Sequence, residues 1–382
     1  MVTEDPTGMR VSVTSDLGAY ADAWDSLVES LPIPSPFLRS WWLDTAAGAR
    51  PCIVLALQRD RLVGGLALER DRHLGFERLR LLGAGALCPD HLDAVAAPEM
   101  RAEVAAVLGA WLTRRGDRLL DLDGVVSGSL VAAALPHRFG CERSAVAPWV
   151  ALSSRYLERR SPALRRVVHQ TERRLVRETG SCIVERLDDV ELALRVLHRL
   201  HAQRWGMASS FLGDFDRFAA VCRAAAARGE VIFDVLRAGD EPGAIVVTFE
   251  VAGRLSYYQS GRIPARRWRG AGIVLLARVI DDAGRRGLRD ADLLRGDEAY
   301  KTLFADERRE LWRLRCAVGS RARVALQIDL AVERGRRLAG RTRRRLRSIA
   351  ARRHQSRLSS ESIPGAGRST ASAAPRSASQ SP

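Results

Sequence analysis

The hydrophobic positions of residues 11–151 follow two spacings, one typical of amphipathic helices and one typical of strands. The helical spacing covers 22–30 and 99–116, and the short apolar runs that predict strands cover 52–58, 62–70, 78–83 and 119–125. Only Arg59, Asp60 and Arg61 separate the first two of these runs. This short connection predicts a β-hairpin.

The same order of elements returns after residue 160. Helices are predicted at 162–180, 190–206, 214–229 and 272–287, and strands at 231–237, 244–250, 255–261, 290–294 and 311–318. Pro162 and Gly180 stand at the two ends of the first of these helices, where helix termini favour them. Because hairpins and strand–helix–strand crossovers occur in both halves, the sequence predicts an α+β fold with two tandem mixed-sheet domains.

The predicted organisation has five parts. They are a disordered leader at 1–10, domains at 11–151 and 152–320, a basic amphipathic helix at 321–354 and a disordered tail at 355–382. Of the net charge of +16, residues 321–382 carry +12, from 15 arginines against three acidic residues. Nucleic acid is therefore not expected as a partner of the folded body. The basic helix is a candidate for contact with an anionic membrane surface.

Composition excludes several classes of protein. No apolar run reaches the ~18 residues that a membrane-spanning helix needs. The six cysteines are scattered without a CxxC pair, which predicts reduced thiols in a cytoplasmic protein, with neither a disulfide framework nor a metal. Asp90, His91 and Asp93 have the chemistry of metal ligands, but one histidine and two aspartates in a single loop are more often solvated surface residues.

Residues 267–272 have the chemistry of an anion-binding site. They read Arg-Trp-Arg-Gly-Ala-Gly and connect a predicted strand to the helix 272–287. The first amides of a helix lack partners within the helix, and its dipole is positive at that end. Glycines there let a diphosphate approach, and the flanking arginines add charge. The alternative interpretation is a glycine turn before a core helix, with both arginines in solvent.

The run Arg267-x-x-Gly270-x-Gly272 resembles the R/Q-x-x-G-x-G/A signature of the GNAT acyltransferases, whose loop holds the pyrophosphate of acetyl-CoA. Longer segments resemble the CelD-like branch of that superfamily, which is associated with cellulose biosynthesis and related to the Fem-type aminoacyl transferases. These segments are 165–180, 197–205, 257–264 and 296–304, together with 24–42 and 88–93 in the first domain.

This resemblance implies an acyltransferase that uses acetyl-CoA or another acyl-CoA as co-substrate. The residues expected at the CoA pyrophosphate are Arg267, Arg269, Gly270, Ala271 and Gly272. The thioester is expected where the strand 255–261 separates from the strand 290–294, with its carbonyl polarised by the backbone N–H of Gln259 or Ser260. The first domain lacks the basic glycine motif, so it is expected to shape the acceptor cleft without binding a cofactor.

Lys301 is the only lysine in a chain with 61 basic residues. An ammonium group is a compact point donor, whereas a guanidinium is planar, so a site that needs a point donor resists replacement by arginine. Gly296, Tyr300, Lys301 and Phe304 match the setting of a charge-stabilising lysine in the Fem-type relatives. The resemblance thus implies a catalytic role for Lys301. The alternative is a lysine on a solvated helix.

Other catalytic candidates flank this lysine and the strand 255–261. Asp297 and Glu298 are carboxylates that can take a proton from an attacking amine or hydroxyl, with surface charge or helix capping as the alternative. Tyr257 and Tyr258 alternate faces on a strand, so only one is expected in the cleft, and Tyr258 is assigned to it.

The helix predicted at 190–206 supplies the remaining candidates. His201 and Trp205 are four residues apart, hence on one face, and they match the family pattern LHxxRW. His201 is a further catalytic candidate, against the alternative of a packed core histidine. Arg204 and Trp205, together with Tyr300, are the candidates for binding the acceptor.

Three functions remain open from the sequence. The first is direct transfer of an acyl group from acyl-CoA to an amine or hydroxyl of a sugar-containing, cell-envelope or polysaccharide precursor. The second keeps the fold but takes the acyl group from aminoacyl-tRNA. The third is a non-enzymatic protein that binds a membrane or nucleic acid through its basic tail. The expected location is the cytoplasm or the inner membrane face.

Overall fold

The computed structural model describes residues 8–336, except for 49, 86, 115, 136–139 and 207–208. The prediction of a disordered leader at 1–10 is wrong at its last two residues, because strand β1 (Met9–Thr14) begins at Met9, which is buried. The rest of that leader (1–7), part of the predicted basic helix (337–354) and the predicted tail (355–382) lie outside the described residues.

In the first half, the predicted hairpin and helices are confirmed. Its helices are α1 (Ala21–Glu29), α2 (Ser40–Ala46), α3 (Arg101–Thr113) and α4 (Leu130–Ala134). Its further strands are β2 (Pro51–Gln58), β3 (Arg61–His73), β4 (Phe76–Leu81), β5 (Val95–Ala96), β6 (Arg118–Val126) and β7 (Gly140–Ala151), with 3₁₀ turns η1 (Gly18–Tyr20), η2 (Pro36–Leu38) and η3 (Pro98–Met100). Arg59 and Asp60 both have a positive φ, as the favoured two-residue hairpin turn requires.

In the second half, every predicted helix and strand is present. The helices are α5 (Tyr156–Arg159), α6 (Pro162–Thr179), α7 (Val190–Trp205), α8 (Ser210–Gly213), α9 (Phe215–Ala227) and α10 (Ala271–Arg285). The strands are β8 (Ile183–Arg186), β9 (Val231–Ala238), β10 (Glu241–Val251), β11 (Arg254–Arg262), β12 (Asp290–Asp292) and β13 (Glu307–Val318), with 3₁₀ turns η4 (Arg266–Trp268) and η5 (Lys301–Leu303). Gly180 caps α6 in the left-handed conformation, as expected.

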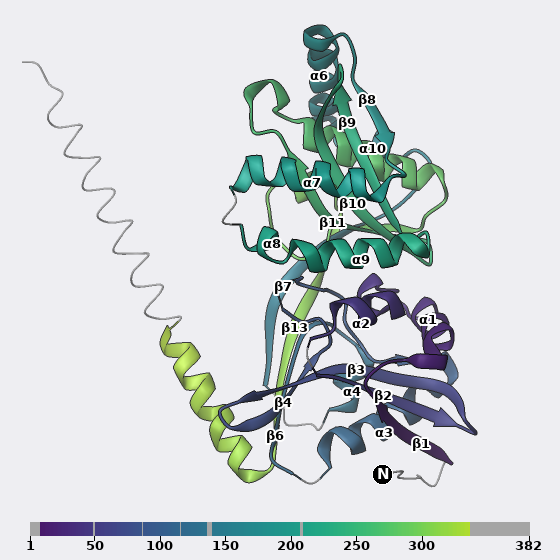
Figure 1. The fold of residues 1–382 in the computed structure, drawn as a ribbon, viewed down its shortest axis with the longest axis vertical. Helices are drawn as coiled ribbons and strands as arrows, with labels where there is room; N and C mark the ends of the chain where they lie inside the picture. The colour runs from purple at the N-terminus through teal and green to yellow at the C-terminus, as the bar shows by residue number, and fades with distance from the viewer. Residues whose placement is uncertain are drawn as a thin grey trace, which may run out of the picture. The chain divides into compact units, whose positions relative to one another are not determined.

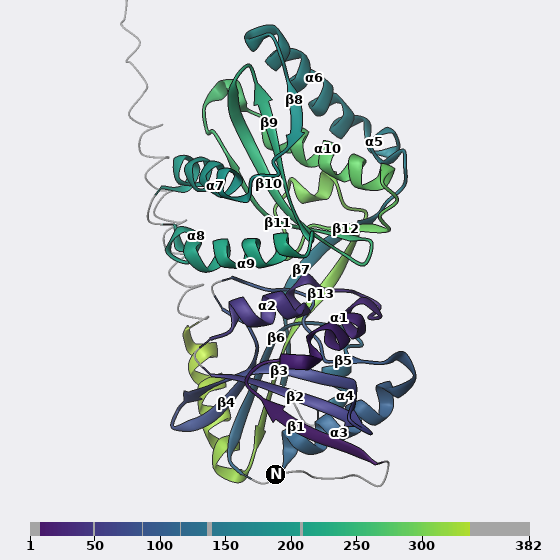
Figure 2. The ribbon, with the colours of Figure 1, turned by 45° about the vertical axis from the view of Figure 1, so that its right-hand side comes forward.

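The strands of the described residues form one 13-stranded sheet in the order β1-β2-β3-β4-β6-β13-β7-β12-β11-β10-β9-β8, with β5 paired to β3. Most pairs are antiparallel, whereas β4–β6 and β11–β12 are parallel. The predicted α+β class with mixed sheets is therefore confirmed. The last strand of each half pairs with the other half, since β13 lies against β6 and β7 lies against β12 (Figures 1 and 2).

Helices cover both faces of the sheet in the first half. Two neighbouring glycines on β3 show this directly, because successive residues of a strand face opposite sides of the sheet. A Cβ atom on Gly64 would meet Val104 of α3, and one on Gly65 would meet Trp24 of α1. Small residues on β3 therefore let both helices approach the sheet closely.

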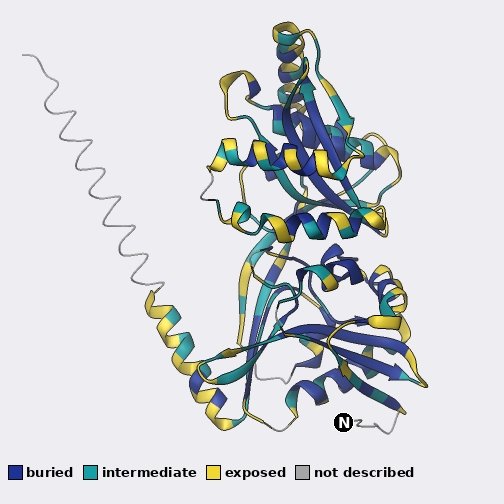
Figure 3. Cartoon of the chain, in the orientation of Figure 1, coloured by how far each residue is buried: buried dark blue, intermediate teal, exposed yellow. Residues whose placement is uncertain are grey.

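The second half has the same layered arrangement. Helices α7 and α9 pack on one face of β9–β11, and α6 and α10 pack on the other. The α6/α10 face has its own apolar core, and the α7/α9 face shares the core of the first half. The strands β9 and β10 between these helices are mostly buried (Figure 3). Helix α10 is thus held by the sheet on one side and by α5 and α6 on the other.

The chain divides into two compact units, one ending at Val324 and the other beginning at Ala325. Residues 320–336 are helical, so the described part of the predicted basic helix is confirmed. Its exposed apolar residues, Val324, Ile328 and Val332, recur every four positions. Among the described residues, no helix has the length and apolar character to cross a membrane.

The close packing of α10 gives a test of the fold. A Cβ atom on Gly284 would lie 2.3 Å from the carbonyl oxygen of Ser153. We expect Gly284→Ala to lower the free energy of unfolding by about 1–3 kcal/mol through overpacking. Gly213→Ala is the control, because its Cβ would meet open space, and it should change stability by less than about 1 kcal/mol. Urea unfolding followed by circular dichroism measures both, and equal effects would contradict the packing.

Candidate active site

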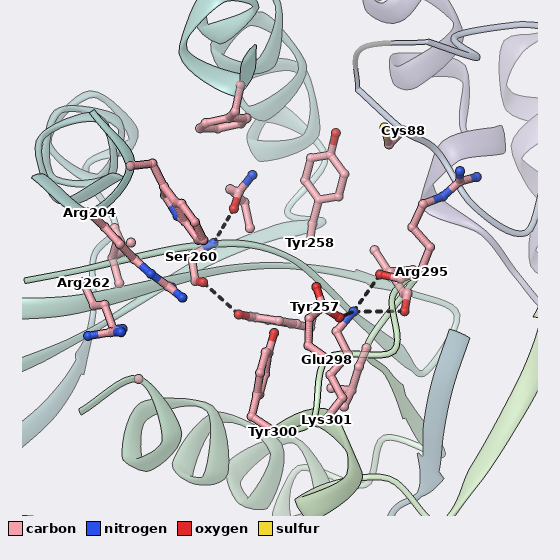
Figure 4. Close-up of a pocket in the computed structure, with 18 of the residues that line it drawn as sticks. Cys88, Arg204, Tyr257, Tyr258, Ser260, Arg262, Arg295, Glu298, Tyr300 and Lys301 are labelled. Atoms are coloured by element: carbon pink, nitrogen blue, oxygen red, sulfur yellow. Dashed lines mark hydrogen bonds and ion pairs between the residues drawn. The ribbon is translucent and has the colours of Figure 1, made fainter. Parts of the chain in front are cut away.

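A cavity opens where β11 and β12 separate. The two strands pair only from Arg254–Asp290 to Ser256–Asp292, after which β11 continues to Arg262 beside β10 alone. The cavity has a volume of about 660 Å³. Its walls come from α7, β11, the start of α10, the loop after β12 and a loop of the first half (Figure 4).

Two adjacent tyrosines of β11, at a bulge in this strand, line the cavity. In the β10–β11 ladder, Thr248 pairs with Tyr257 and Val247 pairs with Gln259, so Tyr258 is an extra residue. The expectation that only one of the two tyrosines faces the cleft is wrong, because both line it. Their side chains do alternate, since Tyr257 packs against the α6/α10 core and Tyr258 against the α7/α9 core, and the cavity reaches both at the open edge of β11. The Tyr257 hydroxyl donates to Ser260 Oγ at 2.8 Å, and the Tyr258 hydroxyl donates to the Leu87 carbonyl at 2.6 Å.

One end of the cavity is built around the start of α10. Gly270 is the N-cap residue with φ of 88°, and an added Cβ would lie 2.6 Å from Thr171 Oγ1, so this position requires glycine. Gly272 also lines the cavity, and its Cβ would make an ordinary contact with Arg262 at 3.6 Å. No described side chain caps the helix, so its first amides are available to a ligand.

Three arginines line this end, which we call the arginine end: Arg204 from α7, Arg262 from β11 and Arg269 before α10. None of them forms an ion pair with a described carboxylate. Burial, followed by the charge of Arg204, lowers the pKa of Arg262. Two like charges are therefore held close together in a partly buried place, an arrangement that an anion would stabilise. Arg262 was not among the candidates from the sequence.

The opposite end contains Lys301, and its side chain is only 4% exposed. Its ammonium donates to the carbonyl of Arg295 at 2.7 Å and of Leu294 at 3.3 Å, and it pairs with Glu298 at 3.0 Å. The alternative of a solvated lysine is therefore wrong. These three partners use the three donors of an ammonium, and a planar guanidinium has a different donor geometry. This explains why lysine suits the position.

Most of the candidate residues lie around the cavity, but four do not line it. Asp297 is exposed, and Ala271 is buried inside the start of α10. Arg267 is exposed and pairs with Glu241. His201 is buried, with its Nε2 atom 3.0 Å from Ser209 Oγ, and burial lowers its pKa.

The remaining candidates line the cavity. They are Arg204, Trp205, Tyr258, Gln259, Ser260, Arg269, Gly270, Gly272, Glu298, Tyr300 and Lys301. The Arg204 guanidinium lies 4.5 Å from the centre of the Trp205 ring, and 59% of Trp205 is exposed. The backbone N–H of Ser260, a candidate donor to a carbonyl, already donates to the Gln259 side-chain oxygen at 2.9 Å. A ligand that uses this donor must displace that side chain.

Three residues of the first half also line the cavity: Leu87, Cys88 and Asp90. They were not among the site residues predicted from the sequence. The expectation of a solvated loop here is wrong, because Asp90 is fully buried and His91 is 3% exposed. Burial raises the pKa of Asp90 to about 6, against the lowering effect of Arg295. The signal that could have located this loop is its aspartate–histidine pair flanked by apolar residues. Among the described residues, no group of three or more ligand side chains is arranged for a metal.

A buried charged cluster lies beside this part of the cavity. The fully buried Asp292 accepts from Arg254 and, at 2.7 Å, from Arg309, and its carboxylate is 3.4 Å from the His91 ring. Desolvation lowers the pKa of His91 to about 3, so its ring is neutral at physiological pH. The cluster joins β11, β12, β13 and the first-half loop at the point where the cavity begins.

Backbone strain is also concentrated here. Cys88, His91 and Leu294 have φ values of 46°, 55° and 54°. Left-handed conformations are unfavourable for such side chains, and residues held in them concentrate at functional sites. Each of these residues belongs to one of the two loops, 87–91 and 293–301, that meet at the cavity.

Comparison with known proteins agrees with this geometry. Residues 162–302 match the family model described as an acetyltransferase (GNAT) domain. These residues are therefore similar to GNAT acetyltransferase domains, and we call them the GNAT domain. The expectation of an acyltransferase is confirmed, and the match includes β11, α10 and the loop that carries Lys301. No curated protein sequence matches the chain.

Solved structures resemble the chain well beyond the GNAT domain. A crystal structure of FemX is similar with a TM-score of 0.54 and 11% identity, over 77% of this chain and 95% of FemX. A conserved protein of unknown function from Bacteroides thetaiotaomicron VPI-5482 is similar with a TM-score of 0.54 and 10% identity, over 80% of this chain and 99% of that protein. At this level of identity the likeness concerns the fold.

The contacts of Lys301 predict that its substitution destabilises the GNAT domain. Lys301→Met keeps the apolar stem but leaves two carbonyls and Glu298 without their donor, so the free energy of unfolding should fall by about 1.5–3 kcal/mol. Arg308→Met, at an exposed position on β13, is the control and should have little effect. Urea denaturation compares the variants, and an unchanged Lys301→Met protein would rule out this anchoring role.

The low pKa of His91 predicts an acid-sensitive fold. The unfolded chain binds a proton at His91 near pH 6.5, whereas the folded protein does so only near pH 3, so acidification between these values favours unfolding. From pH 7 to pH 5 the native protein should lose about 2 kcal/mol more than His91→Gln. Urea titrations at both pH values test this, and parallel losses in the two proteins would show that His91 is not responsible.

Proposed function

We propose that this protein transfers an acyl group from acyl-CoA to an amine or hydroxyl of a sugar-containing or cell-envelope precursor. The GNAT domain supports an acyl-CoA donor. The resemblance of segments such as 165–180 and 296–304 to the CelD-like branch supports a precursor of polysaccharide biosynthesis as the acceptor, an inference by analogy.

The arginine end of the cavity carries this proposal. Arg204, Arg262 and Arg269 come from three separate segments and line the same cavity as the uncapped start of α10. A diphosphate supplies the negative charge that relieves the repulsion between Arg204 and Arg262, and it accepts hydrogen bonds from the first amides of the helix. Acyl-CoA joins such a diphosphate to an arm that ends in a thioester.

The open edge of β11 suits that arm. No described strand pairs with β11 beyond Ser256 on the side of β12, so backbone groups along this edge can pair with the amides of an extended ligand. When the diphosphate of the donor binds at Gly270 and its arm follows this edge, the thioester lies towards Gln259 and Ser260. Glu298 and Lys301 line the same cavity.

We assign Glu298 as the group that accepts the proton of the attacking amine or hydroxyl, because its carboxylate is half exposed in the cavity. The nucleophile forms a bond to the acyl carbon while the bond from that carbon to sulfur breaks. The leaving thiolate takes a proton from solvent, and Glu298 releases the proton it has accepted to solvent. Tyr300, whose pKa is raised by burial and by Tyr257, stays protonated and can donate a hydrogen bond to the leaving sulfur. Lys301 holds Glu298 in place.

We further propose that the basic helix brings the enzyme to an anionic membrane surface from the cytoplasm. In its described part, the exposed residues Val324, Ile328 and Val332 share one helical spacing, which is suited to insertion between lipid headgroups. The rest of the segment 321–354 supplies most of its arginines. Nucleic acid is not proposed as a partner.

Substitution of two arginines, one inside the cavity and one outside it, tests whether acyl-CoA is the donor. Arg262 lies in the cavity, whereas Arg267 is exposed outside it and paired with Glu241. We expect acetyl-CoA to bind saturably by calorimetry. Arg262→Ala should raise the Kd at least tenfold, because it removes a charge-assisted hydrogen bond of about 1.5–3 kcal/mol. Arg267→Ala should change the Kd less than threefold.

If millimolar acetyl-CoA does not bind, the acyl-CoA donor is excluded. The aminoacyl-tRNA donor then takes its place, and copurifying RNA would support it. If Arg267→Ala weakens binding and Arg262→Ala does not, the diphosphate lies outside the cavity, at the arginine that the sequence assigned to it. With binding established, release of CoA thiol in the presence of amino sugars such as glucosamine tests the acceptor class.

A further inference from the structure

We infer that Asp90, a residue of the first half, is a positioning residue for acyl transfer in the second half: it fixes the loop 293–301 that presents Glu298 and Lys301. The inference rests on the proposed function for the role of these two residues. The sequence placed Asp90 in a solvated loop, and the family match at 162–302 does not include it.

The contact between Asp90 and the loop is made through one arginine. The backbone N–H of Arg295 donates to Asp90 Oδ2 at 2.6 Å, and its Nε donates to Oδ1 at 2.5 Å. The same guanidinium donates to the Pro89 carbonyl at 3.2 Å and lies 3.4 Å from Asp123. One fully buried carboxylate thus fixes both the backbone and the side chain of Arg295.

The position of Arg295 determines that of Lys301. The shortest hydrogen bond of the ammonium, at 2.7 Å, is to the carbonyl of Arg295, the residue whose N–H is held by Asp90. The ammonium in turn pairs with Glu298 at 3.0 Å. A chain of contacts therefore runs from Asp90 through Arg295 and Lys301 to the carboxylate in the cavity.

Further contacts with the first half support the same loop. Two backbone N–H groups, those of Leu293 and Gly296, donate to the carbonyls of Pro148 and Val146 on β7, at 2.8 and 2.9 Å. Gly124 of β6 makes room for Arg295, since an added Cβ would lie 3.3 Å from its guanidinium. Leu294 is held with a positive φ, a strained state that persists only where its surroundings fix it.

Groups of the first half therefore help to shape this loop. The arginine end, in contrast, consists of second-half residues, and no hydrogen bond or ion pair among the described residues joins it to Asp90. Loss of the Asp90 carboxylate should thus disturb the loop while leaving the binding of the donor diphosphate intact. This separation makes the inference testable.

The test compares Asp90→Asn with Asp93→Asn. Asp93 lies three residues further along the same loop, and its carboxylate accepts hydrogen bonds from the backbone N–H groups of Leu130 and Val131 instead. Burial raises the pKa of both aspartates to about 6, so the substitutions are matched in environment. Amide hydrogen exchange over residues 293–304 is measured in both variants and in the native protein, normalised to global stability.

We expect Asp90→Asn to speed exchange over 293–304 at least tenfold and Asp93→Asn to change it less than twofold. In thiol release from acetyl-CoA, Asp90→Asn should lower kcat at least tenfold with KM for acetyl-CoA within twofold, a split that general destabilisation would not produce. Unchanged exchange in Asp90→Asn overturns the inference, as does equal acceleration in Asp93→Asn. If Asp90→Asn does not fold, Arg295→Lys, which lacks the Nε donor, is judged by the same criteria.

Failure of this inference is distinguishable from failure of the proposed function. Absence of acetyl-CoA binding in the native protein refutes the donor, and the exchange experiment still decides whether Asp90 fixes the loop. Normal binding with unchanged loop exchange in Asp90→Asn refutes the positioning role alone.

Discussion

The antiparallel pairing of β7 with β13 is the interaction on which the rest of the first compact unit depends. Each strand ends one half of the chain but lies against the other half, so the pair joins both halves into one sheet. Its ladder runs from Glu307–Trp149 to Arg315–Gly140. Because backbone hydrogen bonds in a ladder act together, the halves are held in one arrangement. The cavity forms beside this junction, where β12 ends and β11 continues.

Buried charge gives the junction its detailed geometry. Asp292 and Asp90 are both fully buried, and each is surrounded by donors from elements that are distant in sequence. The desolvation of such groups offsets much of their Coulomb attraction, so they contribute little net stability. A buried carboxylate is stable only where hydrogen-bond donors surround it. The donors that these two carboxylates need hold the loops 87–91 and 293–301, with their strained backbone, in one conformation.

The two ends of the cavity have different origins. The arginine end is built by the GNAT domain alone, with three cations and an uncapped helix start. The opposite end is shared, because Arg295 and Lys301 are held in part by groups of the first half. The first half therefore contributes to the site through its contacts with this loop. One set of contacts therefore supports the binding of the donor, and a separate set supports the positions of Glu298 and Lys301.

The sequence by itself determined the helices, the hairpins and the start of α10, since periodicity, capping and turn chemistry act between neighbouring residues. It also located Gly270, Glu298 and Lys301. The tertiary structure alone decided the strand exchange, the cavity position of Arg262 rather than Arg267, and the burial of Asp90. The position of the cavity at the open edge of β11, where both Tyr257 and Tyr258 line it, was likewise invisible in the pattern. Each of these features depends on contacts between residues far apart in the chain. The local sequence does not determine which distant groups a residue contacts in the folded protein.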